Sequence, residues 1–249
     1  MAWVESQSLS FAARHEAEDA DAAARVLDAL EGFRERLSGL FERTPYDIAV
    51  VIHPRPLMLV LAHPWLPLAR MVATPASRRY FAGWFTAREI HVLAPAALER
   101  RASSVPGSRQ ALLLTPEHEY AHLVLGANNP DLPPPFTVAA FRRYVRWAWL
   151  CEGAASHLAG QVPHLRAAIA RRLREGGRPA FPPSAGDAQL LGGTVFTLLE
   201  RERGAEAVVE LARSRLDHPP QALLAGAFGR EAAAVERDWR GYLGSLRAA

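Results

Sequence analysis

A pair of histidines flanks a glutamate in the segment His118, Glu119, Tyr120, Ala121, His122. If this segment is helical, residues four positions apart lie one turn above each other, with about 5 to 6 Å between their β-carbons. Both imidazoles can then reach one metal ion, while Glu119 points away from their common axis. A carboxylate placed there stays outside the metal ligands and can take a proton from metal-bound water. The spacing therefore predicts a metal site with Glu119 as the general base.

A third ligand is required because catalytic zinc normally takes three protein ligands and keeps a fourth position for water. Glu152 stands in the segment Trp149 to Ala155, where glycine and alanines follow the glutamate. Apolar residues precede it at helical spacing, at Phe141, Val145 and Ala148. Glu152 is therefore expected on the buried face of a helix, where a carboxylate needs a partner such as a metal ion. We predict a zinc ion held by His118, His122 and Glu152.

Both ligand segments are expected to lie on helices. Thr115 followed by Pro116 indicates a helix start, with the threonine as cap and the proline at the first helical position, and this helix should run to about Gly126. Thr137 is expected to cap a second helix that runs to about Gly160. The small residues after the third ligand should let the two ligand helices approach closely enough to share one ion.

Upstream of these helices, short apolar runs indicate strands. The runs lie at residues 48–52, 57–61 and 89–93, and the short, mixed segment 8–15 is also expected to be a strand. Residues 8–15 are expected at the edge of a sheet, and a helix should follow them, capped by Asp19 or Asp21 and ended by Pro45. The apolar face of that helix is predicted from Val26, Leu30, Phe33, Leu37 and Phe41.

The chain from residue 187 to residue 243 is expected to be mainly helical. Breaks are expected near Gly204, Pro219 and Gly229. Strands first and helices afterwards predict an α+β fold. Because no segment reads as a linker, residues 1–249 are expected to form one domain, with the sheet in residues 1–110 and the ligand helices in residues 111–249.

The two motifs, H-E-x-x-H followed by W-L-x-E-G-x-A, resemble those of the gluzincin metallopeptidases, the clan that includes thermolysin and the zinc aminopeptidases. The likeness is closest to the peptidase MA-like domains and extends loosely over nearly the whole chain. It implies a zincin fold, bound Zn²⁺ and hydrolysis of peptide bonds in a peptide or protein substrate. It also implies an edge strand between Gly83 and Pro95, to which substrate would bind by strand addition along residues 89–93. The substrate-binding residues would then be Ile90, His91 and Val92.

The stretch that would supply an oxyanion-stabilising tyrosine departs from the family pattern. Members of the family commonly place a tyrosine or histidine downstream of the third ligand, but residues 188–193 contain no tyrosine. Tyr144, His157 and His164 remain as alternatives, and their spacing does not select among them. Two functions therefore stay open, an active zinc peptidase and a catalytically inactive interaction or regulatory protein that retains the zincin scaffold.

Composition excludes several other classes of protein. The formal net charge is +3, and acidic residues alternate with basic ones along the chain, so no nucleic-acid partner is expected. Cys151 is the only cysteine, so no intrachain disulfide can form and a reducing compartment is expected. Acidic residues near the start interrupt any secretory signal, and no apolar run is long enough for a membrane span. We expect a cytoplasmic protein without a membrane partner.

Overall fold

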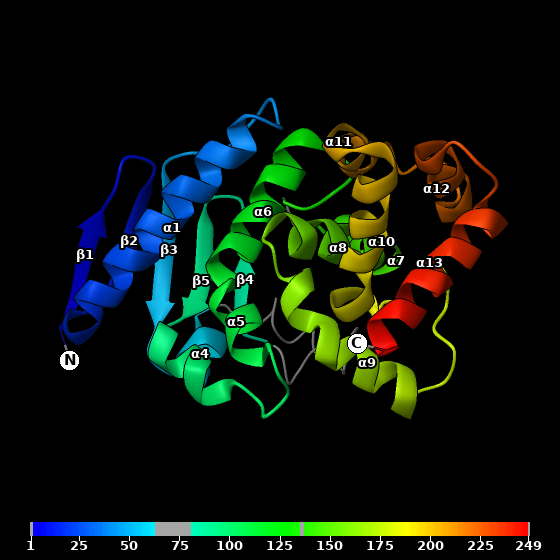
Figure 1. Ribbon diagram of the computed structural model, residues 1–249. Helices are drawn as coiled ribbons and strands as arrows, with labels where there is room; N and C mark the ends of the chain where they lie inside the picture. The colour runs from blue at the N-terminus through cyan, green and yellow to red at the C-terminus, as the bar shows by residue number, and fades with distance from the viewer. Residues whose placement is uncertain (1, 63–80, 135–136, 249) are drawn as a thin grey trace.

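The structure is a computed structural model in which residues 2–62, 81–134 and 137–248 are described. It has the α+β architecture expected from the sequence, and within the described residues the N-terminal part forms a five-stranded sheet and helices follow it toward the C-terminus (Figure 1). Among the described residues, no helix combines the length and the apolar character needed to cross a membrane.

The sheet has the strand order β1-β2-β3-β5-β4. The strands are β1 (Trp3–Gln7), β2 (Phe11–Glu16), β3 (Ile48–His53), β4 (Gly83–Phe85) and β5 (Glu89–Leu93). Strands β2, β3 and β5 run parallel, whereas β1 and β4 pair antiparallel with β2 and β5. The runs at 48–52 and 89–93 are therefore strands, as predicted.

Two expectations about sheet edges were wrong. Residues 8–15 overlap β2, which is paired on both sides because β1 forms the edge beyond it. β1 gave no apolar signal because most of its side chains are exposed. The run at 89–93 forms β5, which is also paired on both sides, since β4 adds to it with Gly83 opposite Val92.

The expected strand at 57–61 is instead the helix α2 (Pro56–Leu61). Pro56 occupies its first turn, where the fixed φ of proline favours a helix and the missing amide hydrogen has no cost. Only Leu59 in this helix is buried, while Leu57 and Leu61 are exposed. An apolar run that short does not distinguish a strand from a helix.

Two helices cover one face of the sheet. Helix α1 (Ala20–Ser38) packs on β2, and α6 (Thr115–Asn128) packs on α1, β4 and β5 (Figure 1). The apolar residues predicted for the first helix are all buried, although the helix ends at Ser38 rather than at Pro45. The same hydrophobic core continues into the C-terminal helices. Helix α6 thus lies between the sheet and the helical part of the molecule.

The helical part contains elements that were expected and others that were not. The helices are α4 (Pro95–Arg101), α5 (Ser108–Leu113), α7 (Val138–Arg146), α8 (Ala148–Leu158), α9 (Arg166–Glu175), α10 (Ala188–Arg203), α11 (Ala205–Arg213), α12 (Pro220–Phe228) and α13 (Ala232–Ala248). The breaks near Gly204, Pro219 and Gly229 are confirmed, and both glycines have positive φ. Helices α4 and α5 were not predicted.

The helix starts were predicted with mixed success. Thr137 caps α7, and its hydroxyl oxygen accepts a hydrogen bond of 3.1 Å from the Ala140 amide. Thr115 does not cap α6, because α5 leads almost directly into α6 and the Thr115 hydroxyl donates to the carbonyl of Leu112. The helix expected from Thr137 to Gly160 is broken at Trp147 into α7 and α8.

Candidate metal centre

The three predicted ligands converge at one buried point. Helix α6 supplies His118 and His122, and α8 supplies Glu152. The Nε2 atoms of the two histidines are 3.2 Å apart. The Glu152 carboxylate lies 3.4 Å from His118 Nε2 through Oε2 and 3.6 Å from His122 Nε2 through Oε1. These side chains are 4% or less exposed, so the group is removed from bulk solvent.

These separations fit a zinc ion. Zinc binds histidine nitrogen at about 2.0–2.1 Å and carboxylate oxygen at about 2.0–2.2 Å, with tetrahedral geometry in most sites. Two ligand atoms at such lengths and at the tetrahedral angle are about 3.3 Å apart. The three distances between ligand atoms, 3.2, 3.4 and 3.6 Å, lie around this value. Two imidazoles and one carboxylate also form a known donor set for a catalytic zinc that keeps one open position.

Glu152 is held in place by a close contact of two helices, though not the contact expected from the sequence. The small residue Gly153 faces Gly192 of α10 rather than the other ligand helix. A β-carbon at Gly153 would come within 2.5 Å of the Gly192 backbone carbon. The glycine is therefore required for α8 and α10 to pack together, and this packing sets the depth at which Glu152 reaches His118 and His122.

The His122 ring has two further neighbours. Phe85 of β4 stacks on His122, with ring centroids 4.6 Å apart. Cys151 lies next to Glu152 in the chain and places its sulfur 3.6 Å from His122 Nδ1. A proton on Nδ1 that points toward this sulfur leaves Nε2 free to bind a metal. This contact could not be predicted from the sequence, because it joins residues of two different helices.

Glu119 lies against strand β4. It is buried, and a β-carbon added at Gly83 would come within 2.9 Å of Glu119 Oε1. The absence of a side chain at Gly83 is therefore what gives the Glu119 carboxylate its room. This role of Gly83 was missed, because a glycine before a strand reads as a turn in the sequence.

Tyr144 reaches the metal centre from α7. Its hydroxyl donates a short hydrogen bond to Glu152 Oε1, and the ring is buried. On one continuous helix, residues eight apart are separated by about 12 Å along the axis. The break at Trp147 lets α7 change direction and brings the phenol to Glu152. Tyr144 was one of three alternatives in the sequence, and only this unpredicted break places it beside the ligand.

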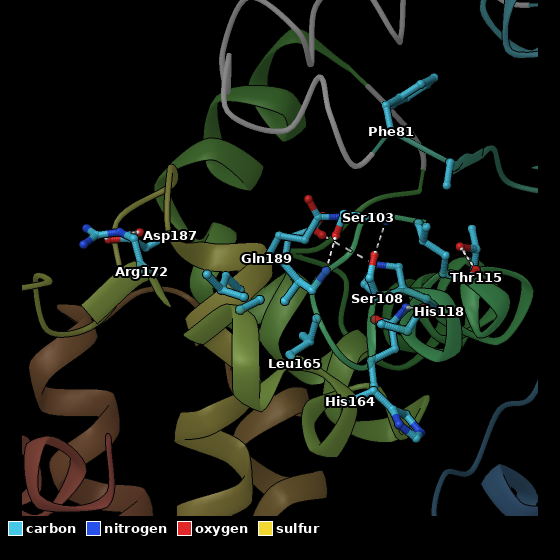
Figure 2. A pocket seen from close by; sticks show the side chains of 18 of the residues that line it. Phe81, Ser103, Ser108, Thr115, His118, His164, Leu165, Arg172, Asp187 and Gln189 are labelled. Carbon is cyan, nitrogen blue, oxygen red and sulfur yellow. Dashed lines mark hydrogen bonds and ion pairs between the residues drawn. The ribbon is translucent and has the colours of Figure 1, made fainter. Parts of the chain in front are cut away.

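A cavity of about 600 Å³ lies beside these residues. His118, Glu119, Tyr144 and Glu152 line it, and the segments 81–83 and 103–106 contribute further walls. Figure 2 shows His118 and Thr115 at one side of the cavity and the Arg172–Asp187 ion pair at another. Arg172 donates to both Asp187 oxygens at 2.8 Å. A molecule in the cavity can therefore reach His118, Glu119, Tyr144 and Glu152. The opposite charges of Arg172 and Asp187 compensate each other.

The predicted substrate residues occupy a different environment from the one expected. Ile90 and Val92 are fully buried in the core, and β4 takes the hydrogen-bonding edge of β5. His91 stacks on Trp84 and lies 3.0 Å from His53 Nε2 through its Nδ1. Strand addition along residues 89–93 is therefore ruled out by β4, and this expectation was wrong.

The two other candidate residues, His157 and His164, differ in whether they line the cavity. His157 lies 3.1 Å from the Thr197 hydroxyl and 3.5 Å from the Glu200 carboxylate, and it does not line the cavity. Burial lowers the pKa of His157, and the neighbouring Glu200 opposes this effect. His164 does line the cavity. The backbone of His164 also packs on Gly107, where a β-carbon would be 2.0 Å from its carbonyl oxygen.

Comparison with known proteins gives no matching family model, no matching curated protein and no matching solved structure. The function must therefore be inferred from the residues of the chain and their arrangement.

Proposed function

We propose that the chain is a zinc-dependent metallopeptidase of the gluzincin type, with a zincin fold and with His118, His122 and Glu152 as the metal ligands. The observation that carries the proposal is the convergence of these three buried side chains, whose ligand atoms lie within 4.8 Å of one another. The adjoining cavity supports it, because a catalytic site needs space for substrate beside the metal. The placement of Glu119 on the same cavity supports the catalytic part of the proposal.

Each residue has a defined task in this proposal. A bound zinc ion supplies Lewis acidity and lowers the pKa of water to about 7. Glu119 takes a proton from the attacking water and returns it to the leaving amine, as a general base and then a general acid. Gly83 leaves space for this carboxylate, and the burial of the site strengthens the electrostatic interactions within it.

The substrate path follows from the corrected sheet order. Strand β4 is the last strand of the sheet within the described residues, and Gly83 and Ala82 line the cavity. An extended peptide is therefore proposed to bind alongside β4 instead of along residues 89–93. Its scissile bond would then lie in the cavity, where His118 and Glu119 line the wall beside Gly83.

Zinc content and peptide cleavage together test the proposal. The zinc-replete protein, freed of unbound metal, should retain about one zinc per chain, and His118→Ala should lose it. Glu119→Gln should keep the zinc and lose cleavage of a quenched fluorescent peptide library. His157→Ala is a matched control, because His157 sits on α8 outside the cavity, and it should keep both properties. Absence of retained zinc in the parent protein would refute the proposal.

The same measurements distinguish an active peptidase from the second candidate function, an inactive interaction or regulatory protein with a zincin scaffold. Retained zinc without cleavage of any library peptide, in both the parent protein and Glu119→Gln, would favour it. This second function is considered because residues 188–193 contain no tyrosine that could stabilise the oxyanion.

A further inference from the structure

Within the described residues, few contacts attach helix α7 to the rest of the protein. Tyr144 is its only buried residue, and the other side chains of Val138–Arg146 are exposed or partly exposed. Helical propensity alone does not stabilise nine residues in water, because short helices depend on tertiary packing. Val145 also packs against the core, but Tyr144 is the deepest anchor of α7, so the position of α7 depends in part on what holds Tyr144.

Within the described residues, Tyr144 forms a hydrogen bond with Glu152, one of the proposed metal ligands. Its phenol donates to Glu152 Oε1, the same oxygen that faces His122 Nε2 at 3.6 Å. A hydrogen bond to a ligating carboxylate fixes the orientation of that carboxylate and tunes its basicity. In the other direction, the carboxylate fixes the phenol, and with it α7. Because Tyr144 also lines the cavity, the same contact sets one wall of the proposed substrate site.

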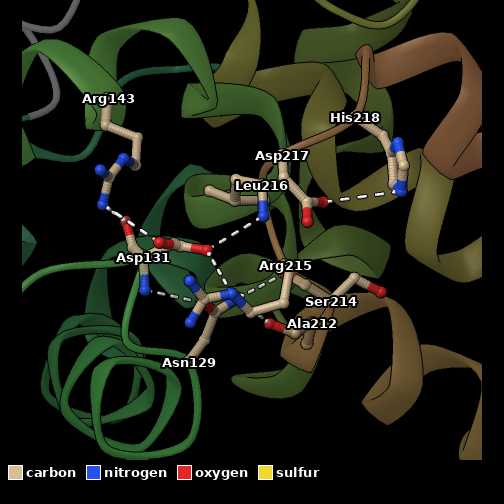
Figure 3. Close-up of polar contacts among 9 residues, drawn as sticks. All are labelled: Asn129, Asp131, Arg143, Ala212, Ser214, Arg215, Leu216, Asp217 and His218. Carbon is tan, nitrogen blue, oxygen red and sulfur yellow. Dashed lines mark hydrogen bonds and ion pairs between the residues drawn. The ribbon is translucent and has the colours of Figure 1, made fainter.

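The second attachment of α7 is independent of the metal centre. Arg143 forms an ion pair of 3.2 Å with Asp131 Oδ1. Asp131 Oδ2 accepts from the Leu216 amide and faces Arg215 Nε, both at 3.1 Å. Figure 3 shows this network joining the segment after α6 to the segment after α11. The Arg143 side chain in this network is 42% exposed. The ion pair therefore contributes little to the attachment of α7.

We propose that Tyr144 is a positioning residue for Glu152 and that it couples metal binding to the docking of α7. This inference rests on the proposed metal site. Linkage is reciprocal, so a phenol that favours metal binding through Glu152 must itself be held more firmly when metal is bound. Zinc therefore both completes the ligand set and stabilises the α7 wall of the cavity.

The test measures zinc affinity and local hydrogen exchange, and it needs no substrate. Zinc affinity is measured by competition with a chelator, and deuterium uptake of residues 138–146 is measured with and without zinc. In the parent protein, zinc should slow exchange in this segment. Tyr144→Phe should weaken zinc binding about 10- to 100-fold, the usual effect of removing a hydrogen bond to a ligand. In this variant, exchange of residues 138–146 should be fast whether or not zinc is present.

Arg143→Ala is the matched control on the same helix. It removes an exposed ion pair but leaves the phenol, so zinc affinity should stay within about fivefold of the parent value. Zinc affinity of Tyr144→Phe equal to that of the parent would overturn the inference, and so would an equal loss in Arg143→Ala. Exchange that zinc does not slow in the parent protein would also overturn it. If the parent protein retains no zinc at all, the proposed function itself fails, and the two failures are thereby distinguished.

Discussion

Gly83→Ala would test how closely strand β4 positions Glu119, the proposed general base. The added β-carbon would stand 2.9 Å from Glu119 Oε1, whereas ordinary van der Waals contact begins at 3.4 Å. The carboxylate must therefore move by about 0.5 Å, since the end of a side chain yields more easily than a paired strand. Displacement of a catalytic group by about 1 Å can lower the rate 100-fold, so about a tenfold fall in kcat is expected. Zinc affinity should not change, because none of the three ligands is displaced.

The same β-carbon would also stand 2.8 Å from the Thr115 methyl group, and this second contact has to be separated from the first. Thr115→Ser removes the methyl and keeps the hydroxyl that donates to Leu112. The double variant Gly83→Ala with Thr115→Ser should remain impaired, because Glu119 is still displaced. Gly226→Ala, where a β-carbon meets nothing within 4 Å, controls for the substitution itself. Full kcat in Gly83→Ala, or recovery in the double variant, would refute the role given to Gly83.

Three further predictions concern stability. Gly153→Ala should lower the free energy of unfolding by about 3 kcal/mol and weaken zinc binding, because the added β-carbon would meet the Gly192 backbone at 2.5 Å. An unchanged chemical denaturation curve would contradict this prediction. Burial and the neighbouring His91 lower the pKa of His53 from 6.5 to about 4. The unfolded chain therefore binds a proton between these values that the folded protein does not, and the free energy of unfolding should fall by up to about 3 kcal/mol as the pH drops from 6.5 to 4. His53→Gln should flatten this dependence, and an unaltered pH profile of urea denaturation would count against it. Burial raises the pKa of Glu117, whose Oε2 has no hydrogen-bond partner among the described residues. Because the buried carboxylate destabilises the folded protein only when it is ionised, Glu117→Gln should raise the thermal midpoint at pH 8 but not at pH 4.

The grouping of His118, His122 and Glu152 could be predicted because local spacing determines much of it. His118 and His122 need only a helix to share one face, and Pro116 after Thr115 indicated the start of that helix. Glu152 could be identified because a carboxylate in an apolar, small-residue segment requires a partner. These signals act over a few residues and survive errors in the surrounding elements, such as the misplaced cap at Thr115.

The rest of the site depends on contacts between distant segments. The pairing of β4 with β5 moved the sheet edge away from residues 89–93, and three residues of β4 are too few to give a periodic signal. The packing of Gly153 on Gly192 joins residues that no local pattern connects. The approach of Tyr144 to Glu152 required a helix break at Trp147, where neither glycine nor proline marks the sequence.

Zinc K-edge X-ray absorption on the zinc-loaded protein would report directly on whether His118 and His122 bind the metal. We expect a four-coordinate zinc with two imidazole nitrogens at about 2.0–2.1 Å and oxygen ligands at about 2.0–2.2 Å. His122→Ala should reduce the imidazole signal to one ring. A spectrum of hydrated zinc without imidazole scattering, or one that His122→Ala leaves unchanged, would contradict the proposed metal centre.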